Sequence, residues 1–142
     1  NPVPVMPIVE IIAGLMTAEE TLQAAEAMSK RMGKETVRAK DYPAFLLNRM
    51  LLPMLNEAFY CLMEGVGTRE DIDKGMRLAM GHPMGPLTLS DFVGLDTLLS
   101  VFEVMYEGYG DPKYFPCPLL RQMVEAGHYG VKSGKGFYDY RK

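Results

Sequence analysis

Cysteine and histidine are scarce in this 142-residue sequence, which contains two of each. Cys61 lies within an apolar segment and Cys117 lies between two prolines, an arrangement that does not indicate a disulfide-bonded scaffold. No signal peptide precedes them, so a reducing cytoplasm or mitochondrial matrix fits. His82 and His128 each stand alone, without a cysteine or carboxylate at ligand spacing. We therefore expect no metal site.

Other familiar signals are also missing. No segment repeats at the periods typical of solenoid proteins, and no tract has low complexity. A net charge of −3 argues against a nucleic-acid partner. The apolar run of residues 44–63 is long enough for a membrane span, but Arg49 and Glu57 make a buried helix the better prediction. Lys132–Gly136 has the composition of a phosphate loop but lacks its spacing and follows no strand, so we reject that interpretation.

What the sequence does contain is enough apolar material for one sizeable core, since 48% of its residues are hydrophobic. Residues 3–12 are β-branched and interrupted by prolines, which predicts an edge strand. A capping box of Thr17 and Glu20, followed by apolar residues at helical spacing, predicts a helix over about 18–32. Residues 36–40 alternate in polarity and predict a second short strand. This part of the chain is therefore expected to form a strand, a helix and a strand.

From Asp41 onward the pattern predicts helices only. The expected helices cover residues 44–64, 68–80, 87–93 and 96–106, and a last one runs from Pro118 to before Gly127. Thr68 with Asp71 is expected to cap the second of these helices, and Asp96 is expected to cap the fourth. The aromatic run 137–140 is expected to fold back on the helical part. The change of pattern at 40/41 is the expected domain boundary.

The first of these helices carries polar residues near its start. Asp41 and Pro43 predict that it begins within a residue or two of Ala44, and Pro53 is expected to kink it. Its four polar residues, which share one half of the helix circumference, are Asn48, Arg49, Asn56 and Glu57. Leucines, methionines and an alanine occupy the other half, among them Leu47, Met50, Leu51, Met54, Leu55, Ala58 and Leu62. We therefore expect this apolar half to face the core.

Glu10 and Asn48 are the residues most able to carry chemistry, and each has a structural alternative. Glu10 sits among apolar residues, where a carboxylate is costly unless it is paired, and its alternative is a solvent-facing position on an edge strand. The amide of Asn48 can donate to a ketone or alkoxide oxygen. Its alternative is a hydrogen bond to its own backbone at the helix start. Arg49 is assigned a structural role, as a partner of Glu57 or another acid.

Four segments, in their order along the chain, resemble the family of 3-hydroxyacyl-CoA dehydrogenases, which are NAD-dependent enzymes of fatty-acid β-oxidation and butyrate metabolism. One segment runs from Asp41 to Pro53, and the residues in it that fit the family signature are Asp41, Ala44, Phe45, Asn48, Arg49 and Pro53. The other three segments are Asn1–Met6, Gly81–Pro86 and Lys132–Tyr140. Two positions depart from the usual pattern, because Pro7 replaces a common lysine and Ala44 replaces the commoner glycine.

The resemblance implies a mainly α fold. Residues 41–142 would form a helical bundle of the 6-phosphogluconate dehydrogenase C-terminal type, which closes the substrate cleft and forms a homodimer. Residues 1–40 would be the strand-helix-strand end of a Rossmann-like NAD domain. No G-x-G-x-x-G fingerprint follows a strand in this sequence, so we expect NAD to bind the full-length parent and not this chain by itself.

The resemblance also implies roles for two residues. Glu10 matches the glutamate of a catalytic His–Glu pair whose histidine would precede Asn1, and Asn48 would position the 3-oxygen or thioester of the substrate. We therefore predict the C-terminal part of an NAD-dependent L-3-hydroxyacyl-CoA dehydrogenase, inactive by itself, with an acyl-CoA substrate and no nucleic-acid or membrane partner. The alternatives are a non-catalytic helical interaction module and a hydroxyacid dehydrogenase acting on free sugar acids. The basic C-terminal tail is interpreted as a solvated end of the chain, in preference to a binding patch for the phosphates of CoA.

Overall fold

The computed structural model describes residues 5–141, so the first two residues of the strand expected over 3–12 lie outside the described range. The chain divides into two compact units, Asn1–Arg49 and Met50–Lys142. The elements in chain order are β1 (Ile8–Ala13), α1 (Glu19–Arg31), β2 (Glu35–Lys40), α2 (Leu47–Met63), α3 (Arg69–Ala79), α4 (Pro86–Val93), α5 (Leu95–Tyr109), the 3-10 helix η1 (Pro112–Tyr114), α6 (Pro118–Glu125) and the 3-10 helix η2 (Val131–Ser133). The mainly α fold is confirmed.

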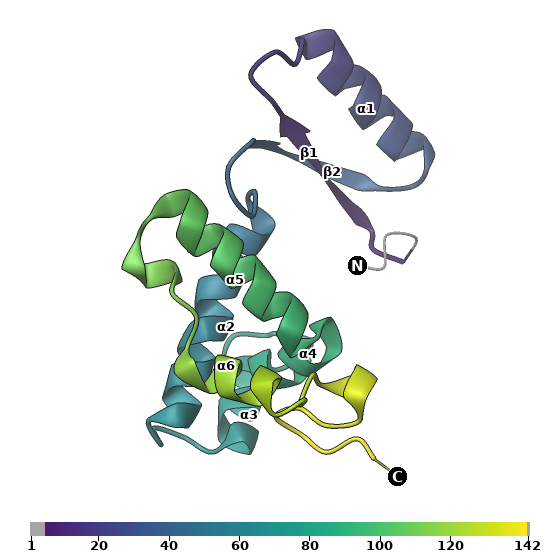
Figure 1. The fold of residues 1–142 in the computed structure, drawn as a ribbon. Coiled ribbons are helices and arrows are strands. Elements are labelled where there is room, and N and C mark those ends of the chain that lie inside the picture. The colour runs from purple at the N-terminus through teal and green to yellow at the C-terminus, as the bar shows by residue number, and fades with distance from the viewer. Residues whose placement is uncertain (1–4, 142) are drawn as a thin grey trace. The chain divides into compact units, whose positions relative to one another are not determined.

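The first unit is a parallel strand pair joined by a helix, as the sequence predicts. β1 and β2 pair in parallel, with Glu10 opposite Val37, and α1 runs beside the two strands (Figure 1). Arg38 of β2 forms ion pairs of 2.8 Å with Glu19 and 2.5 Å with Glu26, both on α1. These exposed pairs hold the helix against the strand that follows it, although exposed ion pairs contribute little to the free energy of unfolding.

The predicted capping box of α1 is wrong. The residue at the N-cap is Ala18, and it makes no side-chain capping bond. The hydroxyl of Thr17 instead accepts a hydrogen bond of 3.0 Å from the backbone N–H of Gly14. Thr17 is thus used to close the turn between β1 and α1, because a short hydroxyl side chain bonds readily to the backbone of a nearby turn.

The start of α2 also differs from the prediction. The helix begins at Leu47 and not near Ala44, because Ala44 (φ 63°) and Phe45 (φ 56°) are both in the left-handed region. The N–H of Phe45 closes a turn onto the carbonyl of Tyr42 at 2.8 Å. Each non-glycine residue in this region costs about 1–2 kcal/mol. Two consecutive residues of this kind make a tight turn that neither Asp41 nor Pro43 could predict.

The buried face of α2 is rotated from the predicted one. Leu52, Leu55, Ala58 and Phe59 are buried with Asn56, whereas Met50 is 68% exposed and Leu47 is also exposed. Asn56 was expected on the polar half, but it is only 5% exposed. Its Nδ2 donates to the carbonyl of Phe115 at 2.9 Å, and its Oδ1 accepts from the N–H of Cys117 at 2.8 Å. The prediction that Asn56 lies on the polar half of the helix was wrong, because a polar side chain that satisfies two backbone groups can enter the core.

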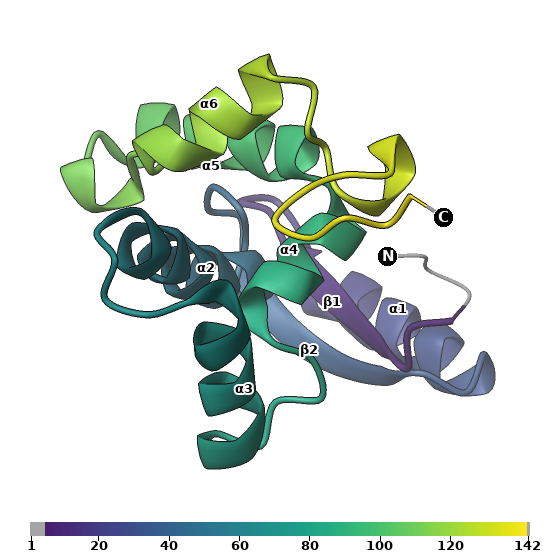
Figure 2. The same cartoon turned by 90° about the horizontal axis from the view of Figure 1, so that it is seen from below.

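The helices of the second unit follow the predicted order. Thr68 caps α3 by accepting from the N–H of Asp71 at 3.1 Å, as predicted. Asp96 is not the cap of α5, because Gly94 occupies that position with φ 101° and Asp96 instead pairs with Lys132 at 2.6 Å. α5 and α6 lie side by side, and α4 packs near α3 (Figure 2). The buried apolar residues of this unit are Leu52, Leu55, Ala58, Phe59, Leu87, Leu95, Leu98, Leu99, Phe102, Met105, Tyr114, Cys117, Leu120 and Phe137.

Two buried carboxylates organise the second unit by accepting backbone N–H groups. Asp73 of α3 accepts from the N–H groups of Leu87 at 2.8 Å and Thr88 at 3.0 Å, which are the orphan donors at the start of α4. Asp91 of α4 accepts from the N–H groups of Phe137 and Tyr138, both at 2.9 Å. Each carboxylate therefore joins its own helix to a different segment of the chain.

The C-terminal aromatic run folds back on the helices, as predicted. The ring of Phe137 stacks on Phe59 with 5.1 Å between ring centroids. The hydroxyl of Tyr138 donates to Asp73 at 3.0 Å, and the hydroxyl of Tyr140 donates to Asp91 at 3.0 Å. This close approach requires a glycine just before the run, because a Cβ at position 136 would overlap Oδ1 of Asp91.

These contacts predict a loss of stability at alkaline pH. Burial, followed by the hydrogen bond to Asp73, holds the pKa of Tyr138 above its usual value. Burial, followed by the charge of Asp91, does the same to the pKa of Tyr140. A tyrosine whose pKa is raised by folding contributes stability that is present below its ordinary pKa of about 10 and is lost as the pH rises through the folded-state value.

We therefore expect Tyr138 and Tyr140 to ionise late in an alkaline titration followed by tyrosinate absorbance, and thermal stability to fall over the same range. The Tyr138→Phe and Tyr140→Phe double variant should lose this late phase. Tyr106→Phe, which changes an exposed tyrosine of α5, is the control and should keep it. Identical titration curves for the double variant and the control would contradict the prediction.

Candidate active site

The carboxylate of Glu10 is anchored by backbone hydrogen bonds within the first unit. Glu10 lies in the middle of β1 and is half-buried. Its Oε1 accepts two backbone hydrogen bonds, from the N–H of Leu46 at 2.5 Å and from the N–H of Leu47 at 3.2 Å. Leu47 is the first residue of α2, so these donors belong to the positive end of a helix. A carboxylate in this position is both paired and held in one orientation.

The backbone that supplies these donors is the left-handed turn before α2. Ala44 and Phe45 reverse the chain immediately before Leu46. Had the helix started at Ala44, as predicted, residues 46 and 47 would have been its third and fourth residues, whereas Leu47 is the first residue of the observed helix. The turn therefore determines which two amides meet Glu10.

Asn48 follows directly after this pair of donors. It is the second residue of α2, and its side chain is exposed. The backbone of residues 46 and 47 therefore bonds Glu10, and the next residue, Asn48, presents its side-chain amide. The two residues that the sequence singled out are thus connected by one short stretch of chain, although their functional roles stay predictions.

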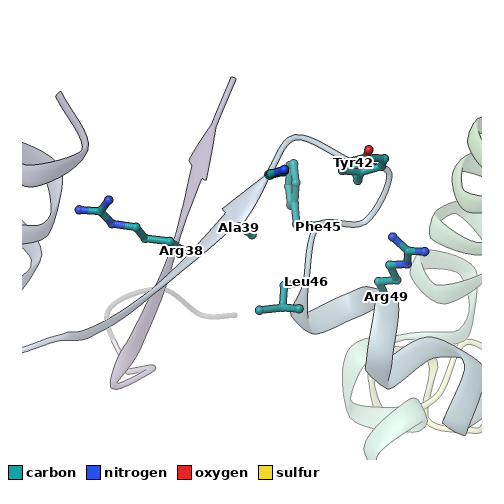
Figure 3. A pocket seen from close by; sticks show the side chains of 7 residues that line it. Arg38, Ala39, Tyr42, Phe45, Leu46 and Arg49 are labelled. Atoms are coloured by element: carbon teal, nitrogen blue, oxygen red, sulfur yellow. The ribbon is translucent and has the colours of Figure 1, made fainter. Parts of the chain in front are cut away.

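A hollow of about 270 Å³ lies beside the same turn (Figure 3). Its lining residues are Arg38, Ala39, Lys40, Tyr42, Phe45, Leu46 and Arg49. The guanidinium of Arg38 points away from Tyr42 and Phe45 and bonds Glu19 and Glu26, so mainly its stem contributes. The guanidinium of Arg49 lies 6.0 Å from the ring centre of Tyr42, a cation–π contact. The predicted pairing of Arg49 with Glu57 stays a prediction.

Other kinds of site are not indicated within residues 5–141. No group of three His, Cys, Asp or Glu side chains in that range is arranged to hold a metal ion. Cys61 and Cys117 are free, and burial raises the pKa of the Cys117 thiol, which disfavours the nucleophilic thiolate. None of the described helices is both long and apolar enough to span a bilayer.

Sequence reasoning missed the groups that hold the site and the bundle together. The donors to Glu10 are backbone amides, which no residue type reveals. Asn56 and Asp91 carried a usable signal, since an isolated polar residue in an apolar helix must find partners if it is buried, whereas Asp73 lies in a helix rich in charged residues and carried no such signal. Their partners lie 14 to 61 residues away along the chain, so their identity required the tertiary structure.

Comparison with known proteins gives two family matches, in order along the chain. Residues 1–42 match the NAD binding domain of 3-hydroxyacyl-CoA dehydrogenase, and residues 45–140 match its C-terminal domain. A curated relative from Bacillus subtilis, described as a probable 3-hydroxybutyryl-CoA dehydrogenase, is 58% identical over 100% of this chain and 50% of its own length. The human mitochondrial hydroxyacyl-coenzyme A dehydrogenase is 42% identical over 99% of this chain and 45% of its own length.

Solved structures agree with these matches. The crystal structure of (S)-3-hydroxybutyryl-CoA dehydrogenase from Ralstonia eutropha has 53% sequence identity and a TM-score of 0.96, and the match covers 100% of this chain and 50% of that one. The two family matches are thus adjoining domains of one kind of dehydrogenase. The chain belongs to the 3-hydroxyacyl-CoA dehydrogenase family, as its sequence motifs predicted, and it spans about half the length of the curated relatives it matches.

Proposed function

We propose that the whole protein is an NAD-dependent L-3-hydroxyacyl-CoA dehydrogenase that interconverts 3-hydroxyacyl-CoA and 3-oxoacyl-CoA, with short-chain substrates of the 3-hydroxybutyryl type. The observation that carries this proposal is the ordered match to both domains of the family. Residues 1–40 would be the end of the NAD domain, and residues 41–142 would be the helical domain of the substrate cleft. Bacterial and mitochondrial relatives support a cytoplasmic or mitochondrial-matrix location.

The residues of this chain do not fit the cofactor by themselves. They include no glycine-rich turn to receive a pyrophosphate at a helix start, so the NAD site would be formed mainly by residues outside the sequence given. When bound there, NAD would accept the hydride from C3 of the substrate.

The roles proposed for Glu10 and Asn48 come from the family resemblance, and the charges of the two side chains suit them. A histidine outside the given sequence would remove the hydroxyl proton, and the Glu10 carboxylate would orient its imidazole and stabilise the charged form. The Asn48 amide is neutral and exposed, so it would donate to the substrate oxygen on which negative charge develops. A neutral donor suits a charge that exists only in the transition state.

Assays of the full-length protein with acetoacetyl-CoA and NADH distinguish this function from its alternatives. Oxidation of NADH that depends on acetoacetyl-CoA is the expected result. Oxidation only with the keto forms of free sugar acids would indicate a hydroxyacid dehydrogenase. Absence of activity with both kinds of substrate would favour a non-catalytic helical interaction module.

Replacing Asn48 tests its contact with the substrate. We expect Asn48→Ala in the full-length protein to lower kcat by roughly 100-fold, the usual effect of losing one transition-state donor, with little change in thermal stability. Gln23→Ala removes an exposed amide from α1 and is the matched control, which should keep wild-type turnover. Wild-type kcat in a folded Asn48→Ala protein would show that Asn48 has the local structural role instead.

Replacing Glu10 by glutamine tests its charge without removing its acceptor. The side-chain oxygen of the introduced glutamine can still accept from the N–H groups of Leu46 and Leu47, so folding should be kept. We expect Glu10→Gln to lower kcat and to change the pH dependence of kcat, because the histidine would lose its charged partner. NAD affinity, measured by fluorescence titration, should be unchanged. An unaltered kcat and pH profile would return Glu10 to the structural alternative.

We also propose that the helical part forms a homodimer. Large apolar side chains are exposed on three helices of the second unit, among them Leu78 of α3, Phe92 of α4 and Val104 of α5. Exposed apolar surface of this kind is commonly buried in a two-fold interface. The chain as given should therefore sediment as a dimer or a larger species at micromolar concentration. A monomer under those conditions would contradict this proposal while leaving the proposed activity untouched.

A further inference from the structure

Residues 45–47, which lead into α2, contribute to the first unit through both their side chains and their backbone N–H groups. The side chains of Phe45 and Leu46 line the hollow, whereas the backbone N–H groups of Leu46 and Leu47 are used on Glu10. Both hydrogen bonds end on the same oxygen, Oε1. Among residues 5–141, no hydrogen bond to the other oxygen, Oε2, is found.

We propose that the N–H groups of Leu46 and Leu47 are a positioning device that orients the catalytic carboxylate of Glu10, and this proposal rests on the function proposed above. Two donors on one oxygen hold the carboxyl group against rotation about its last side-chain torsion. The second oxygen is then directed to a fixed place, where it can accept from an imidazole N–H. The device acts through Glu10 and does not itself touch the substrate.

Helix geometry explains why these two amides are available. The first N–H groups of an α-helix have no partner inside the helix, so those of Leu46 and Leu47 need an outside acceptor. A negatively charged acceptor at this end is further favoured by the helix dipole. The left-handed residues Ala44 and Phe45 set the direction from which the chain enters α2, at an expected cost of about 1–2 kcal/mol each. Backbone strain of this kind persists where the surrounding structure requires it.

The same segment links the carboxylate to the predicted substrate contact. Asn48 follows Leu47 directly, so any shift of the helix start would move the Glu10 carboxylate and the Asn48 amide together. A device of this kind ties the orientation of the Glu10 carboxylate, and through it that of the histidine base, to the position of the Asn48 amide. Its loss should therefore affect the chemical step more than the binding of either ligand.

At position 47 the backbone N–H can be removed by substitution while the helix is preserved. Proline has no N–H, and it is well tolerated at the first position of a helix. Leu47→Pro in the full-length protein therefore deletes one donor to Glu10, and Leu47→Ala measures the loss of the side chain alone. Relative to Leu47→Ala, we expect Leu47→Pro to lower kcat about 10-fold, the size expected for one lost hydrogen bond to a charged group. The KM values for acetoacetyl-CoA and NADH should agree within about 2-fold between the two variants.

A double-mutant cycle separates positioning from a general structural effect. In a Glu10→Ala background there is no carboxylate to orient, so the kcat values of Leu47→Pro and Leu47→Ala should become equal. Equal kcat values in the wild-type background, or an unchanged ratio in the Glu10→Ala background, would overturn the proposal. Wild-type protein without acetoacetyl-CoA-dependent activity would instead overturn the proposed function, so the two failures are distinguishable.

A second variant covers the case in which Leu47→Pro does not fold. Replacing the Leu47 amide by the corresponding backbone ester removes only the N–H and keeps the leucine side chain. The ester variant should show the same selective loss of kcat. A folded ester variant with wild-type kcat would also overturn the proposal.

Discussion

The hydrogen bonds from the first amides of α2 to Glu10 are the interaction on which the candidate site depends. They satisfy two groups that would each be costly without the other, since a half-buried carboxylate needs donors and a helix start needs acceptors. They also join the middle of β1 to a segment more than thirty residues later in the chain. With this contact, a strand and a helix start that are distant in sequence become parts of one site.

The second unit uses the same kind of contact three times. Asp73 accepts from the start of α4, Asp91 accepts from the C-terminal aromatic run, and Asn56 bonds the segment between η1 and α6. In each case a buried polar side chain from a helix satisfies backbone groups of another segment. These hydrogen bonds attach the loops and the tail to the helices, and each buried backbone group among them would otherwise lose its hydrogen bond. The glycine at position 136 is needed for one of these approaches, since a side chain there would displace Asp91.

Membership of the 3-hydroxyacyl-CoA dehydrogenase family gives these contacts a functional setting. The matched domains meet between residues 42 and 45, next to the left-handed pair Ala44 and Phe45. The chain thus contains the passage from the one domain to the other, together with a glutamate before it and an asparagine after it. The hydrogen bonds from the N–H groups of residues 46 and 47 join the Glu10 carboxylate to the stretch of backbone that leads directly into Asn48.

The sequence by itself determined the class of structure and the elements of the fold. Periodicity and turn residues predicted the strand-helix-strand part, the five later helices and the cap at Thr68, because these depend on interactions between residues close in the chain. The motif residues likewise predicted the family and singled out Glu10 and Asn48. What only the tertiary structure decided was where distant partners meet: the late start of α2, the burial of Asn56, the pairing of Asp96, and the amides that hold Glu10. These depend on backbone donors and on burial, and neither is written in the identity of a single residue.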